Sequence, residues 1–137
     1  MFGFEQYTQF CMVNHRPETG FWWMQSIEEP GLAFVVIDPA QFFTGYEFEL
    51  PDSEVERLKL SSANEALVLA VTTISAGGQE ITANLAAPLI INMKEMLAIQ
   101  LILQDNKYQV RQPLVESYPQ PVIQESAKED EQLIKVA

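Results

Sequence analysis

The stretch "GFWWMQSIEEPGLAFVVIDP" (Gly20 to Pro39) holds two runs of strand-forming residues on either side of a turn signal. The runs Phe21 to Gln25 and Ala33 to Ile37 are rich in aromatic and β-branched residues, and Pro30 with Gly31 separates them. We therefore expect two antiparallel strands joined by a short turn.

Short β-rich runs of the same kind recur along the chain. The other expected strands are Gln9 to Val13, Tyr46 to Leu50, Leu67 to Ile74, Thr82 to Leu85, Leu89 to Asn92 and Ala98 to Leu103. The last three follow one another too closely for intervening helices, and one short helix is expected at Ser53 to Leu58, with Asp52 as its cap. The pattern predicts a mostly β fold, a small antiparallel β-barrel-like single domain with one short helix.

The length of 137 residues suits a single domain. We place the β domain at residues 1–115, and we expect residues 116–137, which gain Pro, Gln and charge, to form an acidic, flexible C-terminal tail. The apolar runs are shorter than the ~20 residues that cross a bilayer, and no signal peptide is visible at the N-terminus, so we expect a cytoplasmic protein.

Negative charge is concentrated in one part of the chain. The formal net charge is -11, and eight acids but no Lys or Arg lie between Glu28 and Glu56. Direct nucleic-acid binding is disfavoured, because phosphate backbones require the opposite sign. A basic protein partner would complement this stretch, whereas a solvated acidic face kept for solubility is the alternative reading.

The residues offer little for catalysis. Cys11 and His15 would lie roughly 13 Å apart in an extended chain, too far for a working dyad unless a loop brought them together, so a dyad is disfavoured there. One Cys and one His cannot supply a usual zinc site, and neither calcium-loop nor nucleotide-binding spacings occur, so no metal or cofactor is expected. Glu47 and Glu49 leave one enzymatic alternative, a small-ligand-binding or hydrolytic β-barrel that uses both carboxylates.

Several aromatic residues permit two readings. Trp22 and Trp23 must point to opposite faces of a strand, so one ring is expected in the core while the other is covered by a neighbour or anchors a partner. Phe43, Tyr46 and Phe48 interleave with acids, which fits either a binding anchor with an acidic rim or a corner of the core.

Four stretches in this order resemble the FliW family of bacterial flagellar assembly factors. They are "FWWMQSIEEPGLAFVVIDP", "YEFELPD", "TANLAAPLIIN" and "LQDNKYQVRQPL", and the resemblance runs from Phe2 to Leu114. It implies a compact, barrel-like protein without enzymatic activity that binds partners in the cytoplasm. In "TANLAAPLIIN", Asn84 and Asn92 are expected to satisfy backbone groups near turns.

The resemblance also implies two partners: flagellin, and CsrA, a small basic RNA-binding dimer that represses flagellin translation. Flagellin that accumulates would occupy the protein and free CsrA; flagellin export would reverse the exchange and relieve repression. The charge pattern favours a partner-binding site, with acids steering the encounter and apolar anchors giving affinity. Its expected residues are Asp38, Phe43, Tyr46, Glu47, Glu49, Asp52 and Glu54.

The chain departs from the family pattern at its start. Family members begin with about two further strands before the position of Met1, so a misassigned start, a truncation or a true loss are all open. Without those strands a sheet edge would be exposed, and we expect aggregation, dimerisation or strand swapping.

Overall fold

The computed structural model of the protein describes residues 1, 3–16, 19–75, 77–104, 107–114 and 131–136. One α-helix, two short 3-10 helices and nine strands are described there. In chain order they are β1 (Gln9–Arg16), β2 (Phe21–Ser26), β3 (Ala33–Ile37), η2 (Pro39–Gln41), α1 (Asp52–Arg57), η3 (Ala63–Glu65), β4 (Leu67–Ile74), β5 (Ile81–Ala83), β6 (Leu89–Asn92), β7 (Leu97–Gln100), β8 (Gln112–Pro113) and β9 (Glu131–Val136).

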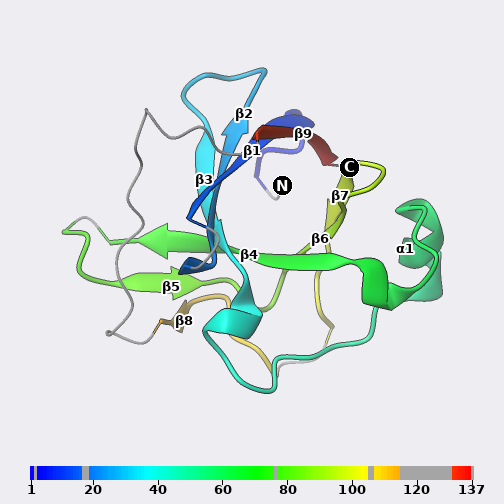
Figure 1. Cartoon of the computed structure of the whole chain (residues 1–137). Coiled ribbons are helices and arrows are strands. Elements are labelled where there is room, and N and C mark those ends of the chain that lie inside the picture. Colours follow the sequence, from blue (N-terminus) through cyan, green and yellow to red (C-terminus); the bar gives the residue numbers. More distant parts are fainter. Residues whose placement is uncertain (2, 17–18, 76, 105–106, 115–130, 137) are drawn as a thin grey trace.

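Seven of the strands form a closed barrel. Their order is β3-β2-β1-β9-β7-β6-β4, and pairing of β3 with β4 closes the ring (Figure 1). Neighbours in the ring are antiparallel except β7 and β9, which are parallel. Closure removes the open edges of a sheet, because every barrel strand then has a partner on both sides. The predicted fold class is confirmed.

β4 is long enough to serve two sheets. Its first residues, Leu67 to Leu69, pair with β6, and its last, Thr72 to Ile74, pair with β5. β5 in turn pairs with β8, so β5 and β8 form a small flap beside the barrel.

β6 and β3 carry apolar side chains on both faces, because one face contacts the barrel core and the other contacts a cluster outside the barrel. In β6, Leu89 and Ile91 belong to the cluster that fills the barrel, while Ile90 belongs to an outer cluster with Leu58 from the end of α1. In β3 the same division puts Val36 inside and Ile37 in a second outer cluster. Successive side chains of a strand point to opposite faces, so segments that cover the barrel from outside require both faces to be apolar.

Two polar side chains hold the turns as expected. The Asn84 side-chain oxygen accepts a hydrogen bond from the backbone of Ala86 at 3.1 Å. The side-chain oxygen of buried Asn92 accepts from the N–H groups of Lys94 and Glu95 in the β6–β7 turn, and its amide donates to the carbonyl of Leu58 at 2.8 Å. Asn92 thereby joins the end of α1 to the barrel, and the expectation for both residues is confirmed.

The expected C-terminal tail is wrong in its last part, because β9 is a barrel strand between β1 and β7. Ile134 and Val136 are buried in the barrel core, whereas Leu133 is 54% exposed. Period-two alternation is present in "LIKV", but the charged residues around it hid the signal. Of the expected tail, residues 116–130 lie outside the described residues.

β9 also changes the expectation for the start of the chain. Five residue pairs join β9 to β1, on the side of β1 that faces away from β2. The edge on which the expected aggregation, dimerisation or swapping rested is therefore occupied within this chain.

The expected strand at Tyr46 to Leu50 is wrong, because the segment is extended but pairs with no described strand. The helix is confirmed with bounds one residue earlier, although Asp52 is its first residue and Pro51 takes the cap position without a side-chain hydrogen bond. Both tryptophans of β2 are half-buried, and Trp22 packs against the barrel core.

Candidate functional site

The acidic stretch crosses the outside of the barrel between β3 and β4. From η2 it runs through an extended segment to α1, seen in Figure 1 as the cyan to green connection. Each expected site residue lies on this connection, so the positions of their side chains decide which of them a partner can reach.

Asp38 serves the local fold. Its carboxylate accepts a hydrogen bond from the backbone of Ala40 at 3.0 Å and caps η2, and its own N–H donates to the carbonyl of Gly20 at 2.8 Å. Asp38 is half-buried and does not line the groove described below.

The two expected aromatic anchors are half-buried. Phe43 and Tyr46 pack against the outer cluster that contains Phe21 and Leu85. The Tyr46 hydroxyl donates a 2.7 Å hydrogen bond to the Leu85 carbonyl, and burial, with the neighbouring Tyr108, raises the pKa of Tyr46 above its usual value. Much of both rings is therefore used to hold the connection against the barrel.

Tyr108 is a residue that sequence reasoning missed. Its ring meets Tyr46 edge to face, with 4.6 Å between centroids and 74° between planes. Its hydroxyl accepts from the N–H of Glu47 at 3.0 Å and lies 2.9 Å from the Glu47 carbonyl, to which it can donate. The stretch "LQDNKYQVRQPL" marked Tyr108 only as part of a family resemblance, because its partner lies 61 positions away.

Tyr108 holds the backbone of Glu47 by these hydrogen bonds, and the Glu47 side chain is exposed. Beyond it the segment alternates, with Glu49 exposed and Phe48 and Leu50 half-buried. This is strand-like geometry without a strand partner, since an extended chain turns successive side chains to opposite sides.

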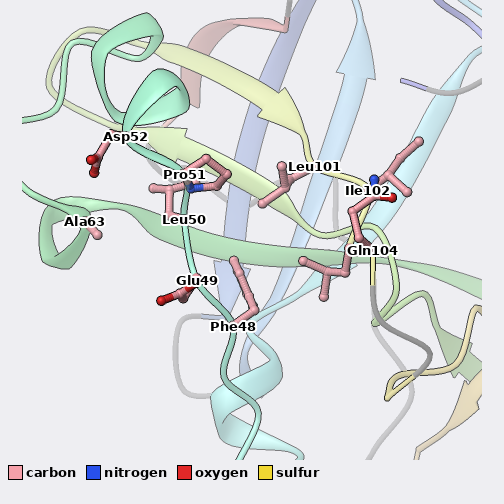
Figure 2. A pocket seen from close by; sticks show the side chains of 10 residues that line it. Phe48, Glu49, Leu50, Pro51, Asp52, Ala63, Leu101, Ile102 and Gln104 are labelled. Atoms are coloured by element: carbon pink, nitrogen blue, oxygen red, sulfur yellow. The ribbon is translucent and has the colours of Figure 1, made fainter.

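An open groove of about 880 Å³ runs between this segment and the chain that follows β7. One wall is Phe48 to Asp52 and the other is Leu101 to Gln104, with Ala63 at one end. Figure 2 shows Phe48 and Leu50 on the first wall and Leu101 and Ile102 on the second, while the carboxylates of Glu49 and Asp52 point away from Leu101. The groove is therefore apolar between its walls and acidic along one rim.

The expected acids fall into distinct groups. Glu49 and Asp52 line the groove, and Glu47 precedes them on the same connection. Glu54 is on α1, half-buried, and its carboxylate lies 3.5 Å from the guanidinium of exposed Arg57, in a single long ion pair that is worth little to stability. The structure thus brings two of the five expected acids to the groove.

The same surface offers little for catalysis. Glu47 and Glu49 lie on the outer face, and the barrel interior is filled by side chains such as Phe10, Met12 and Leu69. Within the described ranges, no group of three or more His, Cys, Asp or Glu side chains could hold a metal ion. Among the described helices, none is long and apolar enough to span a membrane.

Comparison with protein families gives a match to the FliW protein family over residues 1–114. A "Flagellar assembly factor FliW" of Treponema denticola is 37% identical over 114 residues, which is 83% of this chain and 77% of that protein. A protein of the same description from Magnetococcus marinus is 33% identical over 129 residues, 93% of this chain and 78% of that protein.

The fold has a solved counterpart. The crystal structure of the flagellar assembly factor FliW superposes on this chain with a TM-score of 0.73 and 31% sequence identity, over 89% of this chain and 83% of that one. The family match, over residues 1–114, covers β1 to β8 together with the connection that carries the acidic groove.

Proposed function

This chain belongs to the FliW family of flagellar assembly factors, and from that premise we propose that it binds flagellin and CsrA in turn. In this scheme it holds flagellin in the cytoplasm before export and, when flagellin is exported, binds CsrA and relieves repression of flagellin synthesis. It acts by exchange of protein partners and not by catalysis.

The observation that carries the proposal is the family match together with the acidic outer face of the barrel. Eight acids without a Lys or Arg lie between Glu28 and Glu56, and Glu47, Glu49 and Asp52 in this stretch are exposed. CsrA, as the family implies, is a basic RNA-binding dimer. Opposite charge speeds encounter and fixes orientation, so an acidic face suits such a partner.

We propose that the partner-binding residues divide into two roles. Glu47, Glu49 and Asp52 would steer the partner, because their carboxylates are exposed. Phe43 and Tyr46 would hold the connection in place, because both are half-buried and Tyr46 is hydrogen-bonded to Leu85. The remaining expected residues are Asp38 and Glu54. They would add to the negative electrostatic potential but make little direct contact with a partner, because Asp38 caps η2 and Glu54 pairs with Arg57.

The enzymatic alternative, a ligand-binding or hydrolytic barrel that uses Glu47 and Glu49, gains no support from this geometry. Both carboxylates are exposed on an outer segment, and neither faces the barrel interior. A water-excluded pocket with a converging acid and base is what such chemistry needs.

Size-exclusion chromatography with light scattering tests the proposal. The protein would be mixed in turn with flagellin and with CsrA from the same organism, at low and at high salt. We expect a complex with each, and we expect the CsrA complex to weaken with salt, because screening shortens the reach of exposed charges. Separate elution from both partners at both salts, by a monomeric folded protein, would refute the function.

A double charge-reversal variant tests whether the surface around Glu47 and Glu49 binds CsrA. Glu47→Lys with Glu49→Lys, which reverses two charges, is expected to slow association with CsrA by about tenfold or more at low salt, whereas Glu80→Lys, which reverses one, is the control away from this surface. Glu80 is exposed beside the β4–β5 turn, on the opposite side of the molecule from α1 (Figure 1). If the control slowed association with CsrA equally per reversed charge, only the net charge of the protein would matter and not the position of the acids.

A further inference from the structure

Among the residues that the structure describes, both sequence segments that line the groove include backbone groups without a hydrogen-bond partner in the protein. Among the described residues, no hydrogen bond involves the backbone N–H or carbonyl of Phe48, Glu49 or Leu50. On the facing wall the same holds for Ile102. Unpaired backbone groups need a hydrogen-bond partner, and either water or the backbone of a bound peptide can supply it.

The orientation of Ile102 follows from its neighbours. The N–H of Leu101 donates to the Pro88 carbonyl at 2.9 Å, and the N–H of Leu103 donates to the Ala86 carbonyl at 2.9 Å. Peptide groups of an extended chain alternate in direction, so the N–H and carbonyl of Ile102 point away from Ala86 and Pro88. In the ring, that direction is the β9 side of β7, so the unpaired backbone that borders the groove is that of Phe48 to Leu50, and Ile102 contributes its exposed side chain.

The side chains around the groove have a matching alternation. Phe48, Leu50 and Leu101 are half-buried, and Ile102 is 52% exposed, a large value for an isoleucine. Apolar surface of this kind next to unpaired strand backbone is the usual setting for β-strand addition, in which main-chain bonds give affinity and alternate side chains give specificity.

We infer that the groove binds an extended segment of a partner protein as a strand added to Phe48–Leu50, with Val-like side chains that pack toward Leu101 and Ile102 and Lys- or Arg-like side chains in alternation with them. The wall from Phe48 to Asp52 is five residues long, which matches an inserted strand of about five residues, roughly 16 Å. This inference deepens the proposed function and rests on it for the identity of the partner.

Charge selects a basic segment. The groove rim carries Glu49 and Asp52, both exposed, and among the described lining residues there is no Lys or Arg. A strand that turns its apolar side chains toward Phe48 and Leu101 turns its alternate side chains outward, where they meet these carboxylates. An acidic segment would be repelled at the same place.

The probe is a blocked hexapeptide of alternating valine and lysine, carrying a fluorophore and measured by anisotropy against the full chain. Two matched peptides separate the contributions: one has N-methylated valines, which removes backbone donors, and the other has glutamate in place of lysine. We expect each to bind at least about tenfold more weakly than the probe, because one loses strand hydrogen bonds and the other is repelled.

Variants locate the site. Ile102→Lys is expected to weaken the probe at least tenfold without lowering the melting temperature, because the side chain is exposed, and Glu80→Lys is the control that should leave binding unchanged. Amide exchange gives an independent readout. The N–H groups of Phe48, Glu49, Leu50 and Ile102 should exchange fast in the free protein, and those that pair with the probe should become protected when it binds.

Three results would overturn the inference: no saturable binding up to about 1 mM probe, N-methylated peptide binding as well as the probe, or Ile102→Lys binding as well as wild type. A concentration-dependent dimer dispersed by Ile102→Lys would also overturn it, because a second copy would then be the occupant. The proposed function is judged separately. If flagellin and CsrA bind Ile102→Lys as they bind wild type, the proposed function is supported and the groove is not their binding site. If the probe binds but neither protein does, the groove inference is supported and the proposed function is refuted.

Discussion

Truncation of Ile134 tests whether the C-terminal segment belongs to the barrel. Its side chain is fully buried in the same cluster as Phe10 and Met12, and β9 supplies it from beyond the matched family region. Ile134→Ala removes buried methyl groups and leaves a cavity, which costs about 2–5 kcal/mol in well-packed cores. A domain with a total stability of roughly 5–15 kcal/mol would lose a large part of it.

Leu133 provides the matched control on the same strand. Its side chain is 54% exposed, so Leu133→Ala should change the free energy of unfolding by less than about 0.5 kcal/mol. Ile134→Val, with an expected loss of about 0.5–1.5 kcal/mol, covers the case in which the alanine variant does not fold.

The assay is urea unfolding followed by tryptophan fluorescence and by circular dichroism, with the slope m checked for constancy. The expected order of stability is wild type and Leu133→Ala together, then Ile134→Val, then Ile134→Ala. Equal losses for Ile134→Ala and Leu133→Ala, both near zero, would refute the reasoning, because β9 would then contribute nothing to the folded barrel.

Two further substitutions probe the connection that forms the groove. Asn92→Ala should lower the free energy of unfolding by about 2–4 kcal/mol in urea titration, because the Leu58 carbonyl and the N–H groups of the β6–β7 turn lose their buried partner; a loss below about 1 kcal/mol would contradict this. Tyr46→Phe should cost about 1–2 kcal/mol near pH 8 by leaving the Leu85 carbonyl unpaired. Since the folded-state pKa of Tyr46 is raised, the stability that its hydroxyl adds is complete below the usual value of 10.0 and declines as pH rises above it. The difference in free energy of unfolding between wild type and Tyr46→Phe should therefore become smaller in alkali. A difference that becomes larger would contradict the raised pKa.

The strands of the barrel could be predicted from sequence because their own residues carry the signal. β3, β4 and β6 have the predicted bounds, since β-branched runs bounded by Pro, Gly and Asn leave few alternatives. β5 and β7 differ by a few residues at their ends, where pairing with a neighbour, and not local preference, sets the limit.

The failures have a common physical origin in contacts between distant residues. Tyr46 to Leu50 has the composition of a strand, but it pairs with no described strand, because Tyr108 and the outer cluster hold the segment against the outside of the barrel. β9 has too few apolar residues to stand out, yet β1 and β7 leave a place that its Ile134 and Val136 fill. No local pattern encodes either arrangement.

The candidate site was predictable in its charge and not in its shape. Glu49 and Asp52 were expected to bind a partner and do line the groove, whereas Asp38 is engaged in a cap and Phe43 and Tyr46 are half-buried. The facing wall at Ile102 falls within the predicted strand Ala98 to Leu103, because its own sequence is strand-like, but β7 ends at Gln100 and Ile102 has no backbone hydrogen bond to another described residue.

Release of one partner by the other tests the central claim most directly. Fluorescently labelled CsrA would be bound to the protein, flagellin added in steps, and the anisotropy of CsrA followed. Partner exchange predicts that anisotropy falls to the value of free CsrA once flagellin reaches the concentration of the protein. A stable complex of all three proteins, with anisotropy that stays constant or rises, would contradict the account.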